Sequence, residues 1–186
     1  MPDGFREDFA GNLILGQVLV SESVSLGAGN RLYPGVVIEC RAGASITIGA
    51  DNVFWPGTVI VAEAGCIMIG SFSAFGPGGC TLALDAGGGA IEVGDGCRLR
   101  EGAVLLSDCS IGSGAQVLGP IQVTACRLGA GATYAGPDPA ARGGVLKGTG
   151  RARGLVIGCG EVILGEGCFN QANLTSQRAF HPRALP

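Results

Sequence analysis

Charged, aromatic and histidine side chains are all scarce in this sequence. Charged residues make up 15% of the 186 residues and aromatic residues 5%, there is a single histidine, and 47% are hydrophobic. Glycine and proline interrupt the apolar stretches, so none reaches the roughly 18 consecutive apolar residues of a transmembrane helix. Residues 1–8, MPDGFRED, are acidic and lack the basic and apolar regions of a secretory signal. We therefore expect a cytoplasmic protein that does not associate with membranes.

The sequence also lacks the residue spacings of metal and nucleic-acid sites. The formal net charge of −3 gives no general attraction to nucleic acid. None of the eight cysteines forms a CxxC pair, and His181 is the one histidine, so a tetrahedral zinc site has almost no ligands. Without a secretory signal the cysteines are expected to be reduced, buried thiols. We expect no metal and no cofactor.

Glycine is abundant, with 35 residues, and it marks an internal repeat. An aliphatic residue followed by glycine recurs at intervals of 17 to 24 residues, at Leu26, Ile48, Ile69, Val93, Ile111 and Leu128. Three hexads make 18 residues, so the longer intervals indicate insertions. Short strands joined by glycine or proline corners would stack such repeats at about 4.8 Å per coil.

Alignment on the aliphatic position predicts three stacked columns of inward side chains. Four residues after the aliphatic position, the side chains are small or compact: Asn30, Asn52, Ser73, Cys97, Ala115 and Ala132. Six residues on, they are large: Leu32, Phe54, Phe75, Leu99, Val117 and Tyr134. Twelve residues on, they are Ile38, Ile60, Thr81, Leu105 and Val123. The fold class predicted is all-β, a single-stranded parallel β-helix in one domain of residues 1–186.

This pattern of an aliphatic residue, a small residue, two variable residues and another small residue resembles the hexapeptide-repeat family. The resemblance implies a left-handed β-helix with a triangular cross-section; a right-handed β-helix, with longer coils, is the alternative. We expect an N-terminal cap at 1–23, hexapeptide coils at 24–134 and a protruding basic Gly/Pro loop at 135–154. A final coil at 155–170 and a short tail at 171–186 complete the chain.

A narrower resemblance concerns the coil at residues 62–70, AEAGCIMIG. It is similar to a coil of the small pointed-end subunits of dynactin, which bind partners without catalysis, and to γ-carbonic-anhydrase-like proteins. The anhydrases need three histidines on a metal, so that activity is excluded here. Acyltransferases of the hexapeptide-repeat family use a histidine as general base, and His181 in the tail is the one weak candidate for a catalytic residue.

Two groups of residues are candidates for binding. The basic residues Arg142, Lys147, Arg151 and Arg153 could hold a phosphorylated ligand, although a solvated loop explains them equally well. One residue after the large inward position lie Tyr33, Trp55, Arg100 and Leu118, which would form an outward ladder and an interface, unless adjoining loops cover them.

These features favour a non-catalytic β-helix that acts through assembly or partner binding. A homo-oligomer, with a trimer favoured, or a protein partner is expected. The alternative is a homotrimeric acyltransferase that uses acyl-coenzyme A at a site between subunits. In that case His181 would be the base and the basic loop would hold the phosphates of coenzyme A.

Overall fold

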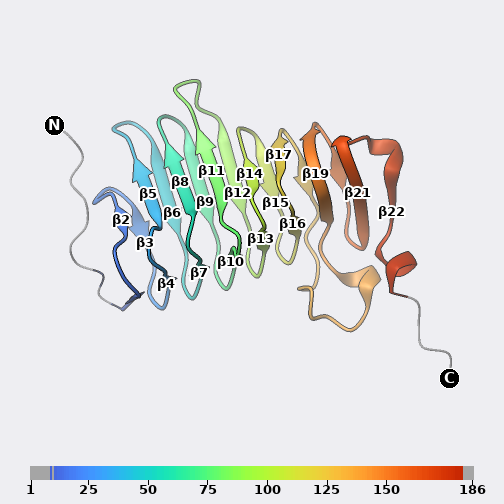
Figure 1. Ribbon diagram of the computed structural model, residues 1–186, viewed down its shortest axis with the longest axis horizontal. Coiled ribbons are helices and arrows are strands. Elements are labelled where there is room, and N and C mark those ends of the chain that lie inside the picture. Colours follow the sequence, from blue (N-terminus) through green and yellow to red (C-terminus); the bar gives the residue numbers. More distant parts are fainter. Residues whose placement is uncertain (1–8, 10, 182–186) are drawn as a thin grey trace.

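The computed structural model describes residue 9 and residues 11–181 as a parallel β-helix with three faces (Figure 1). The coils stack along the long axis of the molecule, from the N-terminal end to the C-terminal end. Residues 1–8 and 10 of the expected N-terminal cap, and residues 182–186 of the expected tail, lie outside the described residues. The described part contains strands and three short 3-10 helices but no α-helix, and hence no helix that could cross a membrane.

Each coil contributes one short strand to each face, and each strand pairs in parallel with its counterparts in the next coils. Face 1 contains β1 (Leu13–Ile14), β4 (Arg31–Leu32), β7 (Val53–Phe54), β10 (Ala74–Phe75), β13 (Arg98–Arg100) and β16 (Gln116–Leu118). Face 2 contains β2 (Leu19–Val20), β5 (Val37–Cys40), β8 (Thr58–Ala62), β11 (Cys80–Leu84), β14 (Ala103–Leu105) and β17 (Ile121–Thr124). Face 3 contains β3 (Ser25–Leu26), β6 (Ser45–Ile48), β9 (Cys66–Ile69), β12 (Ala90–Val93), β15 (Cys109–Ile111), β18 (Arg127–Leu128) and β20 (Val156–Ile157).

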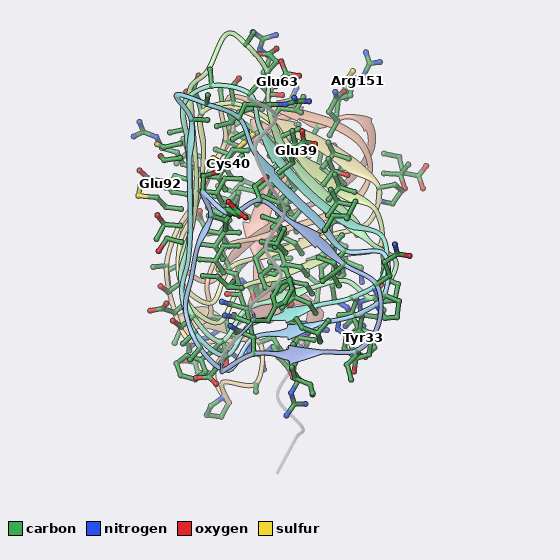
Figure 2. The ribbon with its side chains drawn as sticks, turned by 90° about the vertical axis from the view of Figure 1, so that its left-hand side faces the viewer. Tyr33, Glu39, Cys40, Glu63, Glu92 and Arg151 are labelled. Atoms are coloured by element: carbon green, nitrogen blue, oxygen red, sulfur yellow. The ribbon has the colours of Figure 1, made fainter. Side chains whose placement is uncertain are left out.

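The coils are left-handed. Figure 2 views the molecule from its N-terminal end, with Tyr33 at the lower right, Glu39 and Cys40 near the top and Glu92 on the left. The chain passes from β4 through β5 to face 3 and so turns counter-clockwise as it recedes from the viewer. This is the hand that the resemblance to the hexapeptide-repeat family implies.

The predicted core columns are present, with three corrections. The anchor column is in register throughout, from Leu26 to Leu128, and it continues to Ile157. In the large column Leu146 takes the place predicted for Tyr134, which is 51% exposed. In the third column the buried residue is Leu82 rather than Thr81, because the β10–β11 corner holds one residue more than the β7–β8 corner.

The small column also differs at its last predicted member. Ala132 is exposed on a loop, and Gly144 precedes the strand that pairs with β16 in its place. The other predicted members, from Asn30 to Ala115, are all buried. The physical reason for both the Tyr134 and the Ala132 errors is an insertion after β18 that delays the return of the chain to face 1.

The predicted basic loop at 135–154 is wrong in its second half. Residues 145–153 form β19 (Val145–Arg153), which pairs with β16 on face 1 and then, after a bend, with β17 on face 2. The loop that protrudes lies before β19 and contains the 3-10 helix η1 (Pro139–Ala141). Glycines at 148 and 150 hid the strand, because they form the bend between the two faces with φ of +133°.

The C-terminal segment closes the stack. β21 (Glu161–Cys168) pairs in parallel with β19 along most of its length. After η2 (Gln171–Asn173), β22 (Leu174–Ser176) pairs antiparallel with β21, and η3 (Gln177–Phe180) follows. The expected tail is therefore a terminal cap whose last turn lies beside η1 and the protruding loop.

Candidate functional site

The four predicted interface residues lie on one outward ladder of face 1. Arg100 pairs with Leu118, and the ladder continues to Lys147 and Leu164. At the other end the Tyr33 and Trp55 rings stack on each other, with centroids 4.5 Å apart and planes inclined by 14°. Neither ring is fully covered, so no neighbouring loop buries the pair.

A hollow opens on face 1 next to Trp55. The next ladder position is Gly76, where a Cβ atom would lie 2.5 Å from the Cβ of Trp55, so a larger residue does not fit. The hollow has a volume of about 480 Å³, and its walls include Trp55, Phe72, Pro77, Arg100 and Tyr134. Phe72 is 69% exposed. We call this space the aromatic hollow.

Arg100 lies in the aromatic hollow with an unsatisfied donor. Its Nε atom is buried and has no hydrogen-bond partner among the described residues. A buried donor without an acceptor costs about 1–3 kcal/mol, and more for a charged group. Because the Nε atom is shielded from solvent, a ligand oxygen could reach it only after the Arg100 side chain moves.

The protruding loop divides face 1 into two spaces. Tyr134 extends from the loop over the face, with its ring centroid 3.9 Å from the guanidinium carbon of Arg98. Both residues line the aromatic hollow on one side and a second space on the other. The second space, which we call the basic groove, has a volume of about 400 Å³.

The basic groove is lined from six segments: β13, β16, the protruding loop, β19, β21, and η3 with the residue after it. Its polar and charged residues are Arg98, Gln116, Arg142, Lys147, Gln177 and His181, and no carboxylate of the described residues lines it. The remaining lining residues are Leu118, Tyr134, Val145, Val162, Leu164 and Phe180. Sequence analysis identified Arg142, Lys147 and His181 among these residues but missed Arg98, Gln116 and Gln177, which are not adjacent to the basic segment in the chain.

Hydrogen bonds hold the far wall of the groove in place. The Arg142 Nε atom donates to the carbonyl oxygen of Gly136 at 2.8 Å, and Arg142 Nη1 lies 3.5 Å from His181 Nε2. Gln177, 5% exposed, donates from Nε2 to the carbonyl oxygens of Gly143 at 2.7 Å and Glu161 at 3.1 Å. These bonds bring His181, which is distant in sequence, into the groove.

No ion pair among the described residues involves a positively charged residue of the groove, although the charge of Glu101 acts on Arg98. The ion pairs of the described residues involve Arg41 and Arg178, and neither Arg98, Arg142 nor Lys147 takes part in one. Burial, and then the charge of Arg100, lowers the pKa of Arg98 below its usual value. Arg178, which pairs with Asp138, instead fastens η3 to the loop.

The predicted basic cluster is split between two faces. Arg142 and Lys147 line the basic groove, whereas Arg151 and Arg153 lie after the bend in β19 and pair with outward positions of β17 on face 2. Figure 2 shows Arg151 at the upper right, far above Tyr33 at the lower right. These four residues do not form one site.

Face 2 presents an apolar surface that sequence analysis did not single out. Its outward positions on β5, β8, β11 and β14 are Val37, Glu39, Val59, Val61, Thr81, Ala83 and Val104, all partly exposed. Glu39 is the one charged residue among these seven described positions. The sequence does place valines at alternate positions of these strands. Because the inward and the outward residues are both apolar, the sequence pattern did not show which of them face outward.

The thiols divide into buried and exposed groups. Burial raises the pKa of Cys80 to about 12 and the pKa values of Cys97 and Cys109 to about 11. Cys159 and Cys168 are exposed. No cluster of three or more His, Cys, Asp or Glu side chains suited to a metal occurs among the described residues.

No protein-family model, curated protein or solved structure matches the chain. The fold is defined by its own strand pairing, and function has to be argued from the surfaces of faces 1 and 2.

Proposed function

We propose that the protein is a non-catalytic β-helix of the hexapeptide-repeat kind, which binds a protein partner on face 1. The observation that carries the proposal is the aromatic hollow, whose walls contain the exposed rings of Phe72 and Tyr134, the partly exposed ring of Trp55 and the Arg100 side chain. Aromatic and arginine side chains in a concave surface are the residues that dominate binding energy at interfaces. A partner segment with an apolar side chain beside an acidic one matches this chemistry.

A peptide-display selection tests the proposal. Peptides selected on the wild-type protein should be rich in acidic and apolar residues, and Trp55→Ala and Arg100→Gln should each weaken their binding at least tenfold. Arg127→Gln changes an exposed arginine on face 3 and serves as the matched control. Peptides that bind Trp55→Ala as well as the wild type would contradict the proposal.

We further propose that the protein is a homo-oligomer, a trimer by resemblance, which associates through face 2. The outward valines support this, since solvent-facing strand positions otherwise favour polar residues. Val59→Lys should lower the mass measured by light scattering, whereas Thr47→Lys on face 3 should not. If Trp55→Ala dissociates the oligomer instead, face 1 is the self-association surface.

The second candidate function is acyl transfer. The specific observation in its favour is the position of His181 in the basic groove next to Arg142. The binding proposal expects no turnover of acetyl-coenzyme A by the purified protein. Turnover by the wild type that is abolished in His181→Ala would replace the binding proposal with the enzymatic one.

A further inference from the structure

The basic groove is separate from the aromatic hollow and has a different chemistry. Arg98 from β13, Arg142 from the protruding loop, Lys147 from β19 and His181 after η3 converge on it. Arg98 and His181 are far from the other two residues in sequence, so the fold brings them to the groove, whereas Arg142 and Lys147 belong to the same basic segment of the chain. A lining with several cations and no carboxylate of the described residues creates a positive potential, which a partly enclosed space of low dielectric strengthens.

Two nearby carboxylates are engaged elsewhere. Asp138 pairs with Arg178 at 3.1 Å, on the outside of the loop. The Oε2 atom of Glu161 accepts a hydrogen bond from the backbone N–H of Gly158 at 2.6 Å. Glu101 is a carboxylate whose charge does act on Arg98, so Arg142 and Lys147 are the groove cations that remain without an ion-pair partner among the described residues.

Two glutamines and one guanidinium of the groove are held in place, whereas the Lys147 and His181 side chains are exposed. Gln177 and Gln116, 5% and 7% exposed, form part of its wall, and Gln116 lies 3.4 Å from Arg98 Nη1. The bond from Arg142 to Gly136 fixes one guanidinium. Preorganised donors of this kind reduce the entropy lost when a ligand binds.

Apolar side chains form the rest of the groove. Leu118 and Leu164 lie on the face-1 ladder above and below Lys147, and Phe180 borders the groove at 53% exposure. A fully hydrated inorganic ion would leave these side chains without a partner. A ligand with an apolar body and a charged head would contact both parts of the lining.

We infer that the basic groove binds a doubly charged organic anion with an apolar body, such as a phosphate monoester, whose head lies against Arg142 and Lys147. Two negative charges and three acceptor oxygens match the number of converging donors better than one carboxylate does. The volume of about 400 Å³ lies within the range of small-molecule sites. This inference goes beyond the proposed partner binding and does not depend on it.

Calorimetric titration with phenyl phosphate tests the inference on the full chain. Phenyl phosphate should bind at least tenfold more tightly than inorganic phosphate or benzoate, and phenol should not bind. Lys147→Gln should weaken the binding of phenyl phosphate at least tenfold, because a charged hydrogen bond contributes about 1.5–3 kcal/mol. Arg151→Gln, four residues along the same strand but on face 2, is the matched control and should bind as the wild type does.

Several results would overturn the inference. These are no binding of phenyl phosphate at millimolar concentration, unchanged binding by Lys147→Gln, or an equal loss in Arg151→Gln, which would indicate diffuse charge attraction. Inorganic phosphate that binds as tightly as phenyl phosphate would overturn the apolar component. Thermal melting confirms that each variant is folded. Trp55→Ala lies outside the groove and should retain phenyl phosphate binding, so failure of the partner proposal and failure of this one are distinguishable.

Discussion

Like residues stack on like residues along the core, and this arrangement sets the importance of single positions. The rings of Phe54 and Phe75 are fully buried and stacked, with centroids 4.8 Å apart, which is close to the strand spacing of about 4.8 Å. Leu32 and Leu99 continue the column on either side. Removal of either ring therefore takes contacts away from the side chains on both sides of it in the column.

Phe54→Asp should lower the free energy of unfolding by more than about 3 kcal/mol, because it combines a cavity with a buried unpaired charge. Chemical denaturation monitored by circular dichroism measures the change. Phe72→Asp is the control, since Phe72 is 69% exposed and its φ of +60° is one that aspartate tolerates. A Phe54→Asp protein with unchanged stability would show that the column register is wrong.

The buried thiols should make the protein sensitive to alkaline pH. Burial raises the pKa of Cys80 to about 12 and of Cys97 and Cys109 to about 11, above the value of 9.0 of a free thiol. Above pH 9 the unfolded chain loses protons that the folded chain keeps, so stability is full below pH 9 and falls between about pH 9 and 12. Denaturation at several pH values tests this, with Cys80→Ala expected to flatten the dependence of stability on pH.

At pH 8 a thiol reagent should modify Cys159 and Cys168 much faster than the buried cysteines.

At the scale of the element, a ladder of buried amides joins the coils along the edge of face 1. The Asn52 Oδ1 atom accepts from the backbone N–H of Ser73 at 2.9 Å, and Asn52 Nδ2 donates to Asn30 Oδ1 and to the Gly70 carbonyl. Asn30 Oδ1 in turn accepts from the Asn52 backbone N–H at 3.0 Å. These bonds satisfy backbone groups that the glycine corner leaves without strand partners.

Asn52→Ala should cost about 2–4 kcal/mol, because it leaves two or more buried polar groups without partners. Cys97→Ala, in the same column, should cost less than about 1 kcal/mol, because alanine already stands at the next position, Ala115, and thiol hydrogen bonds are weak. Equilibrium unfolding in urea compares the two variants. Equal losses would show that the column stabilises by packing alone.

At the scale of the whole molecule, a β-helix must prevent its end strands from pairing with other chains. Face 1 and face 2 both reach β21 at the C-terminal end, where the antiparallel β22 covers part of its edge. The same segment carries η3, which fastens the loop through Arg178 and places His181 in the basic groove. The C-terminal cap therefore both covers part of a strand edge and forms part of the wall of the basic groove.

Deletion of residues 171–186 should expose the edge of β21 and produce end-to-end association, seen as increasing mass with concentration in light scattering. Deletion of residues 182–186 alone keeps β22 and η3 and provides the control. If the longer deletion leaves the mass unchanged, β22 is not the element that prevents stacking.

The sequence alone determined the repeat, the parallel β-helix and most of the inward columns, because stacked coils impose one local pattern again and again. The left hand and the three faces were expected from the resemblance to the hexapeptide-repeat family. It did not determine where the pattern resumes after an insertion. Tyr134 and Ala132 were therefore predicted at core positions that belong to Leu146 and Gly144, and Thr81 at the position of its neighbour Leu82. Strand β19 was missed because its glycines resemble loop composition, and only the parallel pairing with β16 and β17 made it a strand. The basic groove was likewise decided by tertiary structure: Arg98, Arg142, Lys147 and His181 come from different coils, and their distance in space depends on the fold of the loop and cap rather than on any spacing in the chain.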